Sequence, residues 1–313
     1  MIALVCLLLL SIVIVIPFWR ENKLKTMNDM ARKKAPGQFV KLTNGMTHYE
    51  WFGPSDAPVI VCIHGLTTPA FVWNGLIQDL IKLGYRVLIY DLYGRGFSDR
   101  PKDLQNRTFF LRQLNELLES QDVNKDITVF GFSLGGAIAT AFASARSCDV
   151  QQLILIAPAG IKIEGMQFIR RIMLTLGLGD WFARSIYRWL HRRNTETERS
   201  FSSSVPNIVD RQQQELDYKG FCPAVLSSLR GIARETQDTD HKLISQFQIP
   251  TLVILGETDE IIPPSVRQQL NEWNANTHIA LIQNAGHGIP YTHSPQISEI
   301  LKDFLQPQNT AVK

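Results

Sequence analysis

The 313-residue chain is 45% hydrophobic, which is enough apolar material for one large domain with an insertion. Its net charge of +3 is too small to indicate a nucleic-acid-binding protein, and the sequence contains no basic and aromatic recognition module. Four scattered cysteines, none in a Cys-x-x-Cys pair, predict neither a metal site nor a disulfide framework. We expect no cofactor, no metal and no obligate protein partner.

The chain begins with an almost continuous apolar stretch from Ile2 to Phe18, which ends at Trp19-Arg20. This stretch is at the lower length limit for crossing a bilayer. A cleavable signal normally has positive charge before the stretch and small residues at its end, and neither is present. We therefore expect residues 1–19 to be an uncleaved membrane anchor. The alternatives are a signal that is cleaved from a secreted protein and a buried segment.

Residues 20–37 form a basic linker, in which six Lys and Arg side chains against two acidic ones favour the cytoplasmic side of a membrane. Beyond the linker, the runs 39–42 and 46–52 flank Asn44-Gly45. This dipeptide is the usual sequence of a tight hairpin turn, because both residues tolerate positive φ angles. The sequence therefore predicts an antiparallel pair of strands at the start of the folded domain.

Short apolar runs bounded by turn residues follow along the rest of the chain, and each predicts a buried parallel strand. These runs are residues 59–63, 86–90, 127–130, 153–156, 251–255 and 278–282. Helical stretches lie between most of them, so the predicted fold is of the α/β class, with a doubly wound and mostly parallel sheet. We place this domain at residues 38–306 and expect residues 307–313 to be a tail.

One connection, residues 158–248, is far too long for a simple crossover and predicts a helical lid or cap. In its first half, the apolar side chains of Phe168, Ile172, Trp181 and Trp189 are interspersed with arginines. Such helices suit a membrane surface that contains anionic lipid. They could equally pack over the core domain, and the two roles are compatible.

The segment Gly131-Phe132-Ser133-Leu134-Gly135 joins a predicted strand to a helix rich in small residues. A Gly-x-Ser-x-Gly in this context is typical of a nucleophile elbow, a strained turn that holds the serine hydroxyl at the top of a sheet. The glycines relieve the crowding that the turn creates. Ser133 is therefore the predicted nucleophile.

A serine hydroxyl needs an imidazole to take its proton and a carboxylate to orient the imidazole. Asp259 and His287 each follow a predicted strand, which completes the chain order Ser, Asp, His. Glu257 and Glu260 compete for the acid role, and His293 competes for the role of base. We prefer Asp259 for its place in the turn after the strand, and His287 for its glycine-flanked loop.

The loop after the strand 59–63 begins with His64-Gly65-Leu66. In a serine hydrolase of this kind, that loop and the residue after the nucleophile each supply one backbone N–H to the developing oxyanion. The predicted donors are therefore the amides of Leu66 and Leu134. We expect His64 to brace the loop rather than to take part in catalysis.

Five motifs in a fixed order carry a resemblance to a known family. They are His64-Gly65 with Trp73 downstream, the loop 91–98, the elbow 131–135, the turn 256–263, and Gly286-His287. Over residues 38–306 the chain resembles the α/β-hydrolase superfamily, specifically its bacterial lipase and esterase branch. The segments 48–52, 91–98 and 157–160 are similar to membrane-associated triacylglycerol lipases of cold-adapted bacteria.

The resemblance implies a carboxylic-ester hydrolase, a triacylglycerol lipase that cleaves acylglycerol-type esters through an acyl-enzyme, with lipid as substrate. Dehalogenases and epoxide hydrolases of this fold carry an aspartate where this chain has Ser133. Proline iminopeptidases and carbon–carbon bond hydrolases have a glycine-rich loop where this chain has residues 66–69. The alternatives are a thioesterase or peroxidase-like enzyme with the same triad, and a catalytically silent binding protein.

Overall fold

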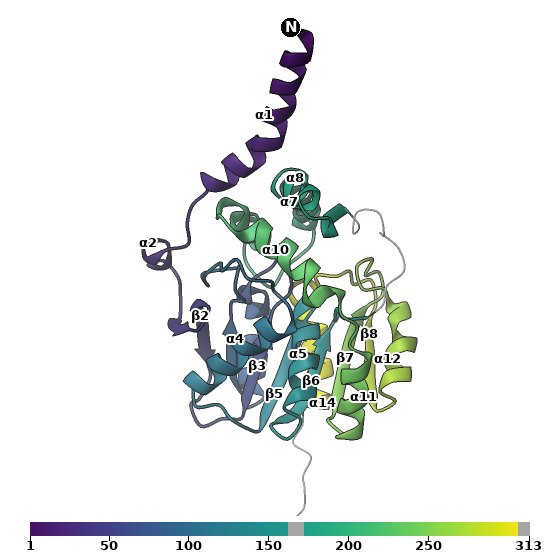
Figure 1. Ribbon diagram of the computed structural model, residues 1–313. Coiled ribbons are helices and arrows are strands. Elements are labelled where there is room, and N and C mark those ends of the chain that lie inside the picture. The colour runs from purple at the N-terminus through teal and green to yellow at the C-terminus, as the bar shows by residue number, and fades with distance from the viewer. Residues whose placement is uncertain (162–171, 306–313) are drawn as a thin grey trace, which may run out of the picture.

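A computed structural model describes residues 1–161 and 172–305, and the structural statements below concern these residues (Figure 1). The centre of the molecule is an eight-stranded sheet with the strand order β1-β2-β4-β3-β5-β6-β7-β8. The strands are β1 (Gln38–Leu42), β2 (Gly45–Phe52), β3 (Val59–Ile63), β4 (Arg86–Tyr90), β5 (Ile127–Phe132), β6 (Val150–Ile156), β7 (Thr251–Gly256) and β8 (Thr277–Ile282). The pairs β1–β2 and β2–β4 are antiparallel and the other five pairs are parallel, which confirms the predicted α/β fold with a mostly parallel sheet.

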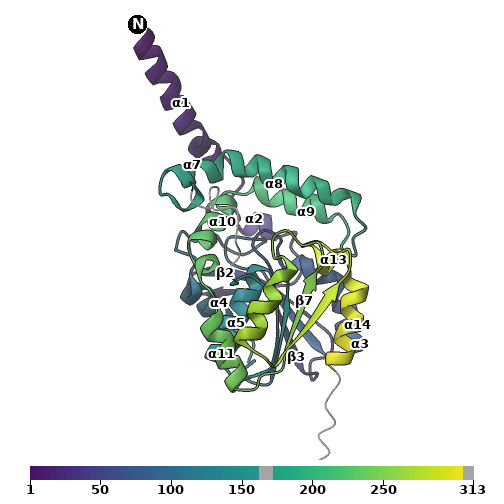
Figure 2. The ribbon, with the colours of Figure 1, turned by 90° about the vertical axis from the view of Figure 1, so that its right-hand side faces the viewer.

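Helices cover both faces of the sheet, with α3 and α14 on one face and α4, α5 and α11 on the other (Figure 2). The helices that flank the sheet and its edge are α3 (Ile77–Lys82), α4 (Arg107–Ser120), α5 (Leu134–Ala145), α11 (Asp238–Gln246), α12 (Arg267–Trp273), α13 (Ile289–Thr292) and α14 (Ser294–Phe304). Glycine and alanine dominate the start of α5, which lets it lie closely against the sheet, and it is buried from Leu134 to Ser144. This burial fixes the turn that precedes α5.

Four further helices lie over the carboxyl ends of the strands, as Figures 1 and 2 show. They are α7 (Leu178–Arg184), α8 (Ile186–Thr197), α9 (Ile208–Gln214) and α10 (Phe221–Arg230), and we call them the cap. The cap has small apolar clusters of its own, one around Phe221 and Val225 and another around Met173 and Leu226. Phe168, which we expected among the apolar side chains of the lid, lies outside the described residues.

The apolar N-terminal segment is the helix α1 (Ile2–Asn22), which runs past the predicted end of the anchor. Among the described residues, it is the one helix both long and apolar enough to cross a membrane, a test that signal sequences also pass. The predicted linker contains the short helix α2 (Asp29–Arg32) and is not simply an extended spacer. Arg32 is buried there, because its guanidinium pairs with Asp99 and donates to the carbonyl of Phe97.

The end of α1 is attached to the cap by specific contacts. Trp181 donates its indole N–H to the carbonyl oxygen of Val13 at 3.0 Å, and the Arg184 guanidinium lies 4.9 Å from the centre of the Phe18 ring. Glu21 is 6% exposed and accepts a 2.7 Å hydrogen bond from the amide of Gly220. These contacts place α1 on the same side of the molecule as the cap (Figure 2).

Candidate active site

Ser133 lies on the turn between β5 and α5, with φ 53° and ψ −117°. Such a backbone conformation is rare and strained for a residue with a side chain, and it is held here by the packing on both sides. A Cβ at position 131 would lie 2.4 Å from the Gly135 carbonyl oxygen, and one at position 135 would lie 2.1 Å from that of Ile63. Glycine is therefore required at both positions for the turn to form.

The structure brings together the three side chains predicted to form the triad. The Nε2 atom of His287 lies 3.0 Å from the hydroxyl oxygen of Ser133, and its Nδ1 atom lies 2.8 Å from Oδ2 of Asp259. Because the carboxylate can only accept, Nδ1 carries the proton and Nε2 is free to accept one from Ser133. The arrangement can therefore move a proton from the serine to the imidazole.

Asp259 is held in place by more than the histidine. Its carboxylate is buried, and Oδ1 accepts hydrogen bonds of 2.8 Å from the amides of both Ile261 and Ile262. These two amides belong to the turn after β7, which orients Oδ2 towards His287. The ring of His287 also lies against Phe132, with 5.2 Å between the ring centres. The imidazole is thus positioned on its two sides before any substrate binds.

The residues that competed for the roles of acid and base do not join the triad. Glu257 and Glu260 are exposed, and the carboxylate of Glu257 accepts from the amide of Asn284 at 2.9 Å. The Nδ1 atom of His293 lies 2.9 Å from the hydroxyl of Thr292, its neighbour in the chain. None of these three side chains contacts Ser133 or His287 among the hydrogen bonds of the described residues.

The predicted oxyanion donors lie at either side of this turn. The amide of Leu134 is in the first turn of α5, where it has no acceptor within the helix. Within the described part of the chain, the amide of Leu66 donates to no protein acceptor. The close approach of β3 to Gly135 brings the loop that starts at His64 against the start of α5. Both amides are thus available near Ser133, where a negative oxygen would form.

His64 is buried and connects two loops beside the site. Its Nε2 atom accepts a 2.9 Å hydrogen bond from the amide of Leu92, and its Nδ1 atom donates to the carbonyl oxygen of Gly65 at 2.7 Å. Burial lowers the pKa of His64 to about 4, so the imidazole is neutral at pH 7. The observed contacts are those of a residue that braces the loop, as expected.

His48 forms a second histidine–aspartate pair, with 2.7 Å between Nδ1 and Oδ2 of Asp91. Its other nitrogen lies 2.6 Å from the carbonyl oxygen of Pro36, so both nitrogens face acceptors and no serine is engaged. Burial opposes its ionisation, but the charge of Asp91 and these hydrogen bonds outweigh burial and raise the pKa of His48. This pair joins strand β2 to the loop after β4, as expected of a structural residue.

Sequence analysis missed the part that Arg95 plays beside the site. Arg95 is fully buried, and its Nε atom donates to the carbonyl oxygen of Leu66 at 2.9 Å. The same guanidinium donates to the hydroxyl of Ser228 on α10 at 2.8 Å and to the side chain of Gln105. Burial lowers the pKa of Arg95 to about 9. A charged side chain between two glycines, Gly94 and Gly96, was the available signal in the sequence.

Known proteins share this fold. Residues 58–294 match the family model described as the alpha/beta hydrolase fold. Over 212 residues the chain is 28% identical to Lipase 1 of Psychrobacter immobilis, and the match spans 65% of this chain and only 63% of that lipase.

Two further similarities extend over most of the chain. A 2-hydroxy-6-oxononadienedioate/2-hydroxy-6-oxononatrienedioate hydrolase of Paraburkholderia xenovorans is 24% identical over 284 residues, which is 86% of this chain and 94% of that enzyme. The crystal structure of bromoperoxidase from Bacillus anthracis superposes with a TM-score of 0.71 and 22% identity, over 86% of this chain and 99% of that one. At this identity the structural similarity concerns the fold alone.

Proposed function

This chain belongs to the α/β-hydrolase family, whose model matches residues 58–294, and we propose that it hydrolyses carboxylic esters through an acyl-enzyme formed on Ser133. The observation that carries the proposal is the hydrogen-bonded series Ser133, His287 and Asp259 at 3.0 and 2.8 Å. A nucleophile, a base and an orienting acid in contact are the components that acyl transfer needs.

The reaction follows from these contacts. Ser133 Oγ attacks the ester carbonyl carbon while His287 Nε2 takes the hydroxyl proton, and Asp259 stabilises the resulting imidazolium. The amides of Leu66 and Leu134 donate to the negative oxygen of the tetrahedral intermediate. His287 then gives its proton to the departing alcohol, which leaves the acyl group on Ser133. A water molecule repeats these steps, releasing the carboxylic acid and restoring the serine.

We further propose that the substrates are acylglycerol-type lipids and that the protein acts at a membrane surface. The similarity to a lipase supports this proposal, although it covers only 63% of that relative. Exposed apolar side chains on the cap and just before it support the proposal too: Leu176, Leu178 and Trp189 are 81, 55 and 58% exposed. An exposed apolar surface beside a helix able to cross a bilayer suits contact with lipid.

Two measurements test the proposal. A serine-directed fluorophosphonate should label the wild-type protein and fail to label Ser133→Ala, whereas a silent binding protein would not be labelled at all. Rates on p-nitrophenyl esters of increasing chain length should stay high for long acyl chains presented in emulsions. Hydrolysis restricted to short soluble esters would contradict the lipid assignment while leaving the serine chemistry in place. Preference for matched thioesters would favour the thioesterase alternative.

A further inference from the structure

A basic hollow of about 400 Å³ lies where the end of α1 meets the cap. The final turns of α1 form one wall of this hollow, and α7 and α8 form the other. Four arginines line it, with Arg20 on the α1 wall and Arg184, Arg188 and Arg192 on the opposite wall. The triad does not contribute to this hollow, so the site is separate from the proposed active site.

The hollow carries an excess of positive charge. Glu21 is the one acidic residue among the described residues that line it, and one of its oxygens is used by the amide of Gly220. The other oxygen lies 3.8 Å from the Arg188 guanidinium, while Arg184 pairs with Asp180 at 3.4 Å. No ion pair among the described residues involves Arg20 or Arg192.

Two guanidinium groups without acidic partners in one concave site favour a ligand with several negative oxygens. Arg20 and Arg192 approach it from opposite walls, so a phosphate group between them could accept hydrogen bonds from both. The two walls are joined by the hydrogen bond from the Trp181 indole to the Val13 carbonyl oxygen and by the 3.8 Å contact of Glu21 with Arg188. The site is thus formed before a ligand arrives, which lowers the entropic cost of binding.

The position of the hollow indicates the source of the phosphate. Apart from Ser11, the side chains of α1 from Ile2 to Ile16 are exposed and apolar, and the hollow starts at Ile16. Trp19 on α1 and Trp189 on α8 are 59 and 58% exposed at this level, and tryptophan favours the boundary between hydrocarbon and headgroups. With α1 in a bilayer, the hollow would lie at headgroup depth. Figure 2 shows the lower end of α1 next to α7 and the rest of α1 extending away from the molecule.

We propose that this hollow binds the headgroup of an anionic phospholipid, with its phosphate between Arg20 and Arg192 and its acyl chains along the exposed surface of α1. The proposal rests on the membrane attachment proposed above, and it does not require the catalytic serine. The bound lipid would hold α1 and the cap together at the membrane surface.

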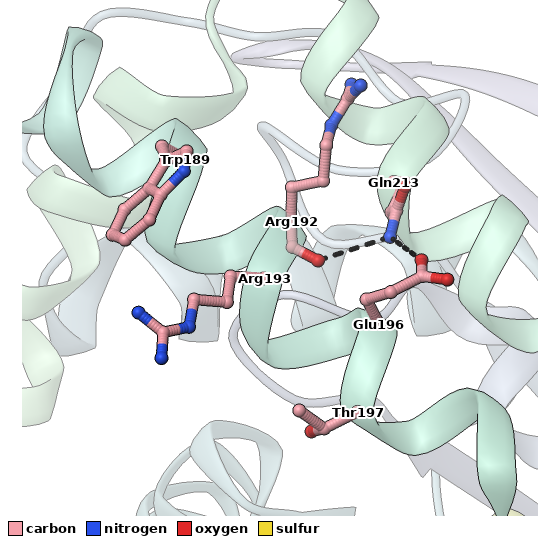
Figure 3. A pocket seen from close by; sticks show the side chains of 6 residues that line it. All are labelled: Trp189, Arg192, Arg193, Glu196, Thr197 and Gln213. Carbon is pink, nitrogen blue, oxygen red and sulfur yellow. Dashed lines mark hydrogen bonds between the residues drawn. The ribbon is translucent and has the colours of Figure 1, made fainter.

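A neighbouring hollow of about 520 Å³ along α8 provides the control (Figure 3). It contains the acidic side chain of Glu196, which accepts a hydrogen bond from the side-chain Nε2 of Gln213 at 3.0 Å and pairs with Arg199 at 2.7 Å. Arg193 lines this second hollow, lies 5.4 Å from the Trp189 ring, and is absent from the first. Arg193→Gln therefore removes the same charge from the same helix as Arg192→Gln, but outside the proposed site.

The experiment measures lipid retained by the full-length protein. Wild type, Arg20→Gln, Arg192→Gln and Arg193→Gln are reconstituted in vesicles of equal phosphatidylglycerol and phosphatidylcholine, extracted in a neutral detergent, and examined by native mass spectrometry. We expect wild type to retain about fivefold more phosphatidylglycerol than phosphatidylcholine, and Arg20→Gln and Arg192→Gln to lose most of this preference. Arg193→Gln should keep it.

Three results would overturn the proposal. Equal retention of the two lipids by wild type, or an equal loss in Arg192→Gln and Arg193→Gln, would leave only a diffuse attraction between charges. Displacement of phosphatidylglycerol by millimolar inorganic phosphate would assign the hollow to free phosphate. Flotation of wild type on phosphatidylcholine vesicles and its hydrolysis of a soluble ester are measured in parallel. Failure of either would count against the membrane attachment or the esterase function separately from the lipid site.

Discussion

Ser133 and His287 handle the same proton in the proposed reaction, so either substitution should remove most of the rate. We expect Ser133→Ala and His287→Ala to lower kcat for ester hydrolysis by roughly 10³–10⁶, as for other residues that act as one unit. His293→Ala is the matched control and should retain near-normal activity, since His293 contacts Thr292 and not the serine. Melting curves of all three variants should show a folded protein. Loss of activity in His293→Ala alone would show that the wrong histidine was chosen.

Arg95 is expected to act as a positioning residue. Its guanidinium donates a hydrogen bond to the carbonyl oxygen of Leu66, and this contact fixes the loop that carries the Leu66 amide. Arg95→Met should lower kcat by about tenfold to a hundredfold with little change in KM, since a displaced donor weakens binding of the transition state only. Arg95→Lys keeps the charge with fewer donors and should fall between this variant and wild type. A rise in KM with an unchanged kcat would show instead that Arg95 shapes the substrate pocket.

At the scale of elements, α11 and α12 enclose a histidine that should make the protein sensitive to acid. His241 is 2% exposed, packs near Trp273, and has an Nδ1 atom without a hydrogen-bond partner among the described residues. Burial lowers its pKa from 6.5 to about 4. The unfolded chain therefore binds the proton more readily, and stability falls as the pH drops from about 6.5 towards about 4.

His241→Leu removes this titration and should flatten the dependence of stability on pH. Between pH 7 and pH 5 the buried histidine costs wild type about 2 kcal/mol, which corresponds to about 3 °C in the melting temperature. On acidification from pH 7 to pH 5, we expect the stability of the variant to fall by that much less than the stability of wild type, as measured by thermal melts at the two pH values. The exposed His278→Leu serves as the matched control. The same acid sensitivity in His241→Leu would rule out this explanation.

The tryptophans of the cap helices should favour substrates that are presented at a lipid surface. Trp181 and Trp189 lie on α7 and α8 near the end of α1, and burying each against lipid is worth at most about 3 kcal/mol. The double substitution to alanine should lower activity on long-chain emulsions by about tenfold or more, while short soluble esters are hydrolysed nearly as before. Phe247→Ala, at the end of α11, removes an exposed aromatic ring elsewhere and is the control. Equal losses of activity on long-chain emulsions and on short soluble esters would show that the cap only packs over the core domain and does not contact lipid.

The elements most readily predicted are those that depend on short-range patterns. Strands β3 and β4 were bounded correctly, because a buried parallel strand is a short apolar run between turn residues. The meeting of Ser133, Asp259 and His287 followed from their places at the same ends of parallel strands. The contacts of Arg95 with α10 and of Glu21 with Gly220 join segments over a hundred residues apart. No local pattern encodes such pairs.

For the whole molecule, the arrangement of α1 and the cap predicts which side would face a membrane that contains α1. Both lie beyond the carboxyl ends of the strands, the end of the sheet that carries Ser133 (Figures 1 and 2). A bilayer around α1 would therefore lie on the same side as the proposed active site. Arg32 is bound to Asp99 in the folded domain, so it adds less to the positive flank than the linker sequence indicates.

The contribution of each part to membrane binding can be separated by removing α1. Full-length protein should float with neutral and anionic vesicles alike, because α1 supplies apolar area whatever the headgroup charge. A chain beginning at Met27 retains every strand of the sheet and the cap arginines, so it should float with anionic vesicles only. About 0.5 M salt should release it, since the attraction that remains is screened over a few ångströms. If the shortened chain ignores anionic vesicles, attachment depends on α1 alone, and the exposed residues of the cap serve the substrate and not the bilayer.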